Sequence, residues 1–253
     1  MSAITPQTFA ERAWLFAKFS ELAYLDPKLG INAFKEFGFK ARFVDCDGSQ
    51  AYLLVNATDI VIVCRGTEPT EFKDIAADLD VRLVSAKVGK GRVHAGFRES
   101  ARDIWTDVNE FVSKHKADHH IWCTGHSLGA AMSTLLAHQL SAHHNVVNLF
   151  TYGSPRVGDR EYARSVKDTG VSHYRFVNNV DIVTSVPGWP YKHYGELIYM
   201  DHDGRVVEMT SWQRAKDRVR GFLKGIAFGK INYFTNHSIA RYVKNLERWK
   251  YKN

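Results

Sequence analysis

The sequence is poor in cysteine and has no long hydrophobic run. These two absences argue against a disulfide-rich protein and against a membrane-spanning one. It has three cysteines among 253 residues, and two of them, Cys64 and Cys123, stand in apolar stretches. Inert buried thiols are therefore expected rather than a disulfide framework, which suits a reducing compartment. No run of about 18 or more apolar residues occurs, so no membrane-spanning helix is expected.

Targeting signals and linkers are also missing from the sequence. Residues 1–10 contain no basic segment, and charged side chains interrupt the apolar stretch that follows, so no signal peptide is predicted and a cytoplasmic location is expected. No Pro/Gly/Ser-rich linker, internal repeat or low-complexity tract divides the chain. With 45% hydrophobic and 24% charged residues, the stretch 1–253 is expected to form a single globular domain.

The most informative motif is the sequence CTGHSLGA at 123–130, in which Ser127 stands between Gly125 and Gly129. An apolar run typical of a buried strand precedes the motif, and a helix-forming run follows it. This pattern predicts a nucleophile elbow, a sharp strand-to-helix turn that strains the serine backbone and needs small neighbours for clearance. The alternative is that Ser127 only caps the N-terminus of the helix.

A serine nucleophile needs a general base and a carboxylate that orients the base. In hydrolases built around such an elbow, the acid and then the histidine follow the serine along the chain. Asp181 follows the predicted strand 172–177 after turn residues, and His237 precedes an amphipathic run near the C-terminus. Asp181 is therefore the leading acid and His237 the leading base.

Other acids and histidines also satisfy this chain order and remain alternatives. The two acids stand around the Asp-Gly turn of a hairpin predicted at 195–209, where aspartate is ordinary, so Asp181 is preferred to them. The alternatives are Asp201, Asp203, His193 and His202.

An oxyanion hole needs two donors that point at one position. The first is expected to be the backbone N–H of Leu128, the residue after the proposed nucleophile. The apolar strand candidate 60–64 runs into Arg65, Gly66 and Thr67. Because Gly66 permits a close backbone approach, Thr67 is expected to supply the second donor. This chemistry needs no metal and no organic cofactor.

Several motifs, taken in their order along the chain, resemble the class 3 lipases, the fungal triacylglycerol lipase type within the α/β-hydrolases. They are RGT at 65–67, VHAGF at 93–97, the elbow around Ser127, TYGSPRVG at 151–158, NNVD at 178–181 and HS at 237–238. The resemblance implies an α/β-hydrolase fold, with a mostly parallel central sheet flanked by helices and a lid at about 68–80. It also implies the triad Ser127, Asp181 and His237. It implies Thr67 and Leu128 as the oxyanion hole, so both sets agree with the local motifs.

The positive charge of the chain is unevenly distributed. The formal net charge is +7, and its excess lies in the stretch 212–231, where basic side chains alternate with aromatic and aliphatic ones. This stretch departs from the compact family pattern because it stands between the triad acid and the histidine. It suits an anionic membrane surface, and the alternative is a core-packed helix with a solvated basic face. Nucleic acid is not expected as a partner, because no recognised binding module accompanies the charge.

Together these patterns predict an enzyme that hydrolyses carboxylic esters of lipids, a triacylglycerol lipase or esterase. The reaction would use a Ser-His-Asp triad and an acyl-enzyme intermediate. An apolar lid would favour ester aggregated at a lipid–water interface over dissolved ester. The alternatives are a phospholipase A, a short-chain esterase and a lipase-like interaction protein without catalytic activity.

Overall fold

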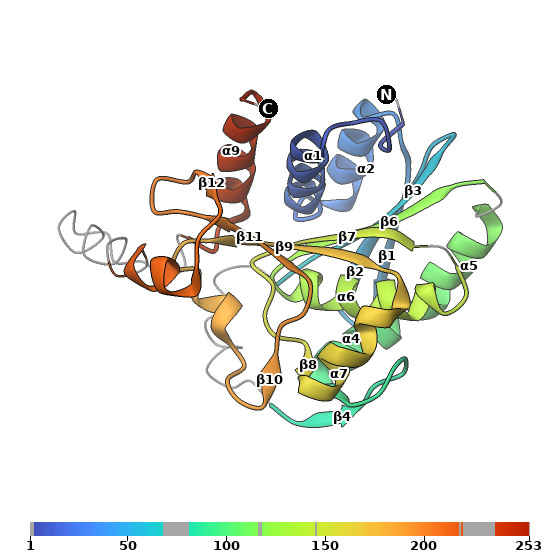
Figure 1. Cartoon of the computed structure of the whole chain (residues 1–253). Coiled ribbons are helices and arrows are strands. Elements are labelled where there is room, and N and C mark those ends of the chain that lie inside the picture. Colours follow the sequence, from blue (N-terminus) through green and yellow to red (C-terminus); the bar gives the residue numbers. More distant parts are fainter. Residues whose placement is uncertain are drawn as a thin grey trace.

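An eight-stranded sheet in the order β1-β2-β3-β6-β7-β9-β11-β12 forms the centre of the molecule (Figure 1). The computed structural model describes residues 3–67, 81–115, 118–144, 146–217, 219 and 236–252. The strands of this sheet are β1 (Lys40–Cys46), β2 (Ser49–Val55), β3 (Asp59–Cys64), β6 (His120–His126), β7 (Val146–Tyr152), β9 (Ser172–Asn178), β11 (Glu196–Met200) and β12 (Val206–Val207). A second sheet has the order β10-β8-β5-β4, with strands β10 (Tyr191–Lys192), β8 (Gly158–Asp159), β5 (Arg92–His94) and β4 (Leu83–Ser85).

Helices cover both faces of the large sheet (Figure 1). On one face lie α1 (Phe9–Leu22), α2 (Pro27–Glu36) and α9 (Ile239–Lys250). On the other lie α4 (Ala95–Asp103), α5 (Trp105–His115), α6 (Leu128–Ser141) and α7 (Arg160–Ser165). The described residues also form two short 3-10 helices, η1 (Val166–Thr169) and η2 (Ile182–Ser185). The prediction of a mostly parallel sheet flanked by helices is confirmed.

The parallel strands place the functional loops at one edge of the sheet. β3, β6, β7, β9 and β11 run parallel to one another, whereas the pairs β1–β2, β2–β3 and β11–β12 are antiparallel. Thr67, Ser127 and Asp181 each follow the carboxyl end of one of the parallel strands, β3, β6 and β9 respectively. Because these ends meet at a single edge, the fold brings three distant parts of the chain together.

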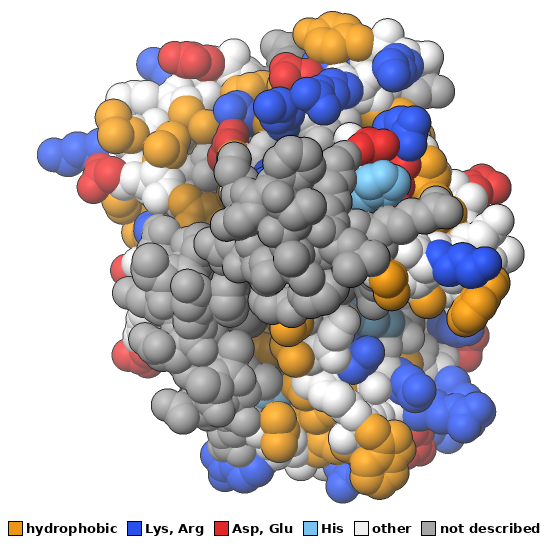
Figure 2. Space-filling view, turned by 90° about the vertical axis from the view of Figure 1, so that its left-hand side faces the viewer, with side chains coloured by type: hydrophobic (Ala, Val, Ile, Leu, Met, Phe, Trp, Pro, Cys, Tyr) orange, Lys and Arg blue, Asp and Glu red, His pale blue; other side chains and the backbone are white. Residues whose placement is uncertain are grey.

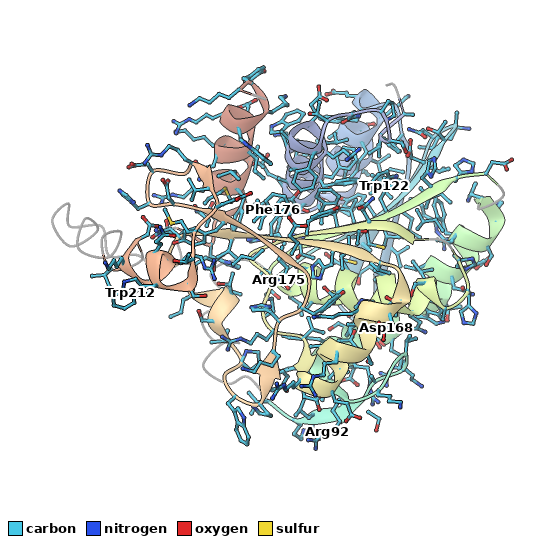
Figure 3. All side chains as sticks on the ribbon, viewed as in Figure 1. Arg92, Trp122, Asp168, Arg175, Phe176 and Trp212 are labelled. Carbon is cyan, nitrogen blue, oxygen red and sulfur yellow. The ribbon has the colours of Figure 1, made fainter. Side chains whose placement is uncertain are left out.

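Aromatic packing fixes α1 against the sheet. Phe16 of α1 lies between Trp122 and Phe150, with ring centroids 5.4 and 4.8 Å apart. Trp122 and Phe176, both labelled in Figure 3, belong to the same buried core. The indole N–H of Trp122 donates to Oδ1 of the buried Asp59 at 2.8 Å, so the tryptophan keeps its hydrogen bond inside the core.

The cysteines behave as expected from their number and surroundings. All three are free thiols, and Cys64 and Cys123 are buried. Burial raises the pKa of Cys64 to about 12, so its thiol stays protonated and inert. Among the described residues, no helix is both long enough and apolar enough to cross a membrane.

Three buried histidines are expected to make the fold sensitive to acid. Burial lowers the pKa of His126 and of His138 to about 3, and it lowers the pKa of His173 well below the ordinary value. A histidine whose folded-state pKa is lowered takes up its proton only on unfolding. The stability that it contributes is therefore present above the unfolded pKa of about 6.5 and is lost as the pH falls toward the folded pKa. Between about pH 6 and 5, we expect the free energy of unfolding to fall by about 1.4 kcal/mol per pH unit for each of the three.

Urea unfolding followed by circular dichroism at several pH values measures this slope. The His138→Gln variant retains groups that can hydrogen-bond to Tyr162 and Tyr194, the partners of His138, and it should lower the slope by about a third. A slope that is the same in this variant and in the wild type would contradict the explanation.

Candidate active site

Ser127 lies at the sharp turn between β6 and α6. Its backbone has φ 59° and ψ −127°, a conformation that costs free energy for a residue with a Cβ. Two glycines give the turn its clearance. A Cβ on Gly125 would lie 2.4 Å from backbone atoms of Gly129, and a Cβ on Gly129 would lie 2.3 Å from the carbonyl oxygen of Cys64. The turn therefore has the geometry of a nucleophile elbow.

The side chain of Ser127 does not cap α6. It forms no capping hydrogen bond, and its buried Oγ has no hydrogen-bond partner among the residues that the structure describes. The interpretation of Ser127 as a simple helix cap is therefore wrong. Buried hydroxyl groups normally form hydrogen bonds, and a role as the nucleophile would explain why this one does not.

Asp181 and His237, 56 residues apart in the sequence, form a buried pair. Nδ1 of His237 lies 3.0 Å from each carboxylate oxygen of Asp181. Oδ1 of Asp181 also accepts the backbone N–H of Val183 at 3.0 Å, and Oδ2 accepts the hydroxyl of Tyr242 at 2.5 Å. Burial would raise the pKa of Asp181, but the charge of His237 and the hydrogen bonds from His237 and Tyr242 outweigh burial and lower it. The carboxylate stays ionised and holds the Nδ1–H tautomer of His237.

The elbow and the Asp181–His237 pair meet at the end of β7. The backbone N–H of Ser127 donates to the carbonyl of Tyr152, the last residue of β7, at 3.1 Å. The next residue, Gly153, lies against the pair, since a Cβ there would be 2.8 Å from Oδ2 of Asp181 and 2.8 Å from Nδ1 of His237. The structure thus brings the predicted serine, acid and histidine to one place.

Thr67 and Leu128 line one pocket beside the elbow, with a volume of about 270 Å³. The turn that carries Thr67 packs directly on the elbow. A Cβ on Gly66 would lie 2.5 Å from the carbonyl oxygen of His126 and 3.3 Å from Cβ of Ser127. Gly66, the residue before Thr67, therefore borders Ser127, and Leu128 directly follows Ser127. The assignment of Thr67 and Leu128 as the two donors to the oxyanion stays a prediction.

His126 and Tyr24 support the loop that carries His237, and no motif in the sequence indicates this role. Nε2 of His126 donates to the carbonyl oxygen of His237 at 2.6 Å, and Nδ1 accepts the hydroxyl of Tyr24 at 2.8 Å. The rings of His126 and His237 lie 4.4 Å apart. Because burial and the neighbouring His237 lower the pKa of His126 to about 3, His126 stays neutral and keeps this tautomer. In the sequence, the position of His126 directly before Ser127 is what could have indicated a role for it.

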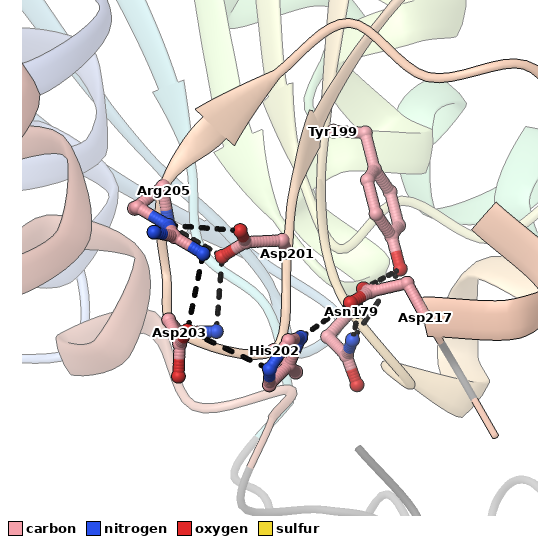
Figure 4. A network of polar contacts seen from close by, with 7 residues as sticks. All are labelled: Asn179, Tyr199, Asp201, His202, Asp203, Arg205 and Asp217. Carbon is pink, nitrogen blue, oxygen red and sulfur yellow. Dashed lines mark hydrogen bonds and ion pairs between the residues drawn. The ribbon is translucent and has the colours of Figure 1, made fainter. Parts of the chain in front are cut away.

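The rival acids belong to the hairpin turn between β11 and β12 (Figure 4). Nε of Arg205 donates to Asp201 at 3.0 Å, and the guanidinium also reaches Asp203 at 3.1 Å. The backbone N–H groups of Asp203 and Arg205 both donate to Oδ1 of Asp201 at 2.9 Å. These carboxylates therefore hold the turn together.

The rival histidines have other partners as well. Nδ1 of His202 forms a hydrogen bond with Oδ1 of Asp217 (Figure 4). Nε2 of His193 donates to the carbonyl oxygen of Thr184 at 2.7 Å. Neither contact involves Asp181, which favours His237 as the base.

The two further predicted segments are described only in part. The lid predicted at 68–80 lies outside the described residues. Of the basic stretch 212–231, residues 212–217 and 219 are described, and a helix at 211–217 leaves Trp212 69% exposed. Trp212 lies at the left-hand edge of the molecule in Figure 3, on the side that faces the viewer in Figure 2. Since all of this helix except Asp217 is exposed or half-buried, the described part is not packed in the core.

Comparison with known proteins agrees with this geometry. The lipase of Rhizomucor miehei is 34% identical over 164 residues, which cover 60% of this chain and 45% of that protein. Phospholipase A1-Igamma2 of Arabidopsis thaliana is 33% identical over 196 residues, which cover 57% of this chain and 37% of that protein. The solved structure of the Rhizomucor miehei triacylglyceride lipase superimposes with a TM-score of 0.68 at 26% identity, covering 77% of this chain and 82% of that one.

The chain spans less than half the length of the curated relatives that it matches. The sequence profile of the family described as "Lipase (class 3)" matches residues 61–191, a little more than half of the chain. The matched residues include the turn that carries Thr67, the elbow and Asp181, and the fold is that of the family's α/β-hydrolase structures. The chain belongs to the class 3 lipase family.

Proposed function

We propose that this protein is a serine hydrolase that cleaves carboxylic esters of lipids. The observation that carries the proposal is the meeting of the strained Ser127 with the buried Asp181–His237 pair on either side of Tyr152 and Gly153. Membership of the class 3 lipase family and the likeness to a triacylglyceride lipase structure support the same reaction.

In the proposed reaction, Oγ of Ser127 attacks the ester carbonyl while Nε2 of His237 takes its proton. Asp181 stabilises the imidazolium that forms, and the backbones of Thr67 and Leu128 bind the oxyanion. The bond to the alcohol then breaks, and His237 returns the proton to the leaving oxygen. Water attacks the acyl-serine with His237 again as base, which releases the carboxylic acid and restores Ser127.

We infer that the substrate lies at a lipid–water interface, because large hydrophobic side chains are exposed on the segment that follows Asp181 and beside it. Ile182 directly follows Asp181, and farther along the same loop Trp189 is 92% exposed. The hydroxyl of Tyr191 donates to the carbonyl of Val81 at 2.8 Å, which brings the exposed Val81 next to this loop. Such side chains are stabilised by contact with an apolar surface.

We also infer that the interface carries negative charge. In the described part of the basic stretch, Trp212 is 69% exposed and Val219 is 57% exposed. The ammonium of Lys216 lies 5.1 Å from the ring centroid of Trp212. Figure 2 shows Lys and Arg side chains among hydrophobic ones on this side of the molecule. Aromatic side chains beside cations suit the headgroup region of an anionic membrane.

A phospholipase A is the second candidate function. The basic and aromatic character of the stretch 212–231 suits phospholipid headgroups, and a relative named phospholipase A1 is 33% identical to this chain. Triacylglycerol presents no headgroup charge to this stretch. The two functions differ in whether the substrate itself carries the charge.

Hydrolysis of p-nitrophenyl esters with acyl chains from two to sixteen carbons, above and below their solubility limits, tests the proposal. We expect turnover that rises when the longer esters aggregate, with Ser127→Ala as the inactive control. Saturation with dissolved short esters alone would indicate a short-chain esterase. No turnover at any length would favour an interaction protein. Emulsified triacylglycerol and phosphatidylglycerol, offered separately, then distinguish lipase from phospholipase.

A further inference from the structure

A cationic side chain, that of Arg175 on β9, is buried under the large sheet. It is 8% exposed and lies on the face that α4, α6 and α7 cover, whereas its neighbour Phe176 lies on the opposite face (Figure 3). Nε of Arg175 donates to the carbonyl oxygen of Tyr194 at 3.2 Å. Within the described part of the chain, the two Nη groups have no hydrogen-bond partner. Four N–H donors of a buried guanidinium are thus left unsatisfied.

The charged groups that act most strongly on Arg175 are also cationic. Burial, followed by the charges of Arg156 and Arg214, lowers the pKa of Arg175 to about 10, so the guanidinium is still charged at neutral pH. No carboxylate among the described residues forms an ion pair with it. A charge that leaves water is destabilising unless an opposite charge pairs with it. The burial of Arg175 therefore indicates a counter-ion that is not part of the described chain.

Arg175 lines a small pocket that such a counter-ion can enter. The pocket has a volume of about 10 Å³, and Thr134 and Ser154 are among its buried lining residues. One water needs about 10 to 15 Å³ on this measure, so there is room for one water or one monatomic ion and none for phosphate or sulfate. The lining also includes the exposed Lys192 and the half-buried His193, which give the pocket a side toward solvent.

His173 lines the same pocket and carries a second unsatisfied group. It stands two residues before Arg175 and therefore shares its face of the sheet. Nε2 of His173 lies 2.8 Å from Oγ1 of Thr151, and the buried Nδ1 has no hydrogen-bond partner among the residues that the structure describes. Burial, followed by the charge of Arg175, lowers the pKa of His173 well below its ordinary value, so the ring is neutral. When Thr151 donates to Nε2, the single ring proton is on Nδ1, and His173 is a second donor.

We propose that this pocket binds one chloride ion through the guanidinium of Arg175. Chloride supplies the missing negative charge, accepts several N–H donors at once and is a monatomic ion, as the size of the pocket requires. A water would accept hydrogen bonds and leave the positive charge without a partner. The ion stabilises the folded state, because it binds a site that exists only when β9 and the segment of Tyr194 are packed together. Chloride binding is independent of the proposed ester hydrolysis.

Crystals of the wild-type protein soaked in sodium bromide locate the ion directly, since bromide replaces chloride and scatters anomalously. We expect an anomalous peak within hydrogen-bond distance of an Nη group of Arg175. An ordered water at that position without an anomalous signal would contradict the proposal, and so would bromide found only at the surface.

Thermal melts of the wild-type protein measure the effect of the ion on stability. Sodium chloride is compared at constant ionic strength with sodium methanesulfonate, whose anion is too large for the pocket. A chloride concentration about a hundredfold above its Kd should raise Tm by about 5 °C or more. A Tm that is the same in the two salts would contradict the proposal.

Variants of Arg175 separate binding at this site from general effects of salt. Arg175→Met removes the charge and the donors, and Arg175→Gln removes the charge and keeps an amide that can donate to Tyr194. Both should melt at nearly the same temperature in the two salts and give no bromide peak in the pocket. Arg164→Gln is the matched control, because it removes an exposed arginine from α7 that does not line the pocket, and it should keep the wild-type response.

A folded Arg175→Met or Arg175→Gln protein that keeps the chloride response would overturn the assignment, as would loss of the response in Arg164→Gln. If neither Arg175 variant folds, the bromide position in the wild type decides. The experiment has no activity readout, so its failure leaves the proposed hydrolase function unaffected.

Discussion

Ser127→Ala should lower kcat for ester hydrolysis by about 10⁵-fold and leave the protein folded. The expectation follows from the position of Oγ, which is buried at the elbow and has no hydrogen-bond partner among the described residues. Removing Oγ deletes the proposed nucleophile and breaks no hydrogen bond between described residues. Steady-state kinetics on p-nitrophenyl butyrate, with a thermal melt beside them, measure both parts of the expectation. A folded Ser127→Ala protein with wild-type activity would contradict the assignment.

The stability of the Ser127 variants distinguishes a nucleophile from a helix cap. Loss of a cap costs about 1 kcal/mol, so a capping serine predicts a less stable Ser127→Ala protein. The structure predicts no such loss, and it predicts that Ser127→Gly is more stable than the wild type, because glycine accepts φ 59° without strain. Ser133→Ala is the matched control. It removes a buried hydrogen bond from α6 to Thr124, so it should cost stability and keep activity.

The order of motifs along the chain was sufficient to predict the fold class and to bring the site residues together. Strands that alternate with helices imply a parallel sheet, and the residues after the carboxyl ends of such strands share one edge. Thr67, Ser127 and Asp181 could therefore be expected to meet. The hairpin around 203–204 was also predicted correctly, because its Asp-Gly turn is a strong local signal.

Other features were not predictable because they depend on packing between distant segments. Residues 95–115 form two helices, α4 and α5, and Ile104 at the break between them is fully buried. The hydroxyl of Tyr242 binds Asp181, although the apolar spacing of its helix indicates only a core residue. No local pattern pairs Tyr24 with His126 or Asp217 with Asn179, since these residues come together only in the folded sheet.

Gly153→Ala should lower kcat by about 10²-fold, although position 153 carries no reactive group. The added Cβ would lie 2.8 Å from Oδ2 of Asp181, 2.8 Å from Nδ1 of His237 and 2.9 Å from Cε1 of His237, distances that real Cβ atoms essentially never show. The acid and base must therefore move, and a displacement of about 1 Å in a catalytic group can cost about 10²-fold in rate. The measurement is kcat and its pH profile on dissolved p-nitrophenyl butyrate.

Gly170→Ala separates this steric effect from backbone strain. Gly153 has φ 58° and Gly170 has φ 76°, so an alanine at either position carries a similar cost of about 1 to 2 kcal/mol. A Cβ on Gly170 would meet nothing within 4 Å, whereas a Cβ on Gly153 meets the acid and the base. Both variants should therefore lose stability through backbone strain, Gly153→Ala should lose more because of the steric overlap, and only Gly153→Ala should lose activity. Equal activity in both would mean that Asp181 and His237 are not held against Gly153 during turnover, and the proposed triad would need another geometry.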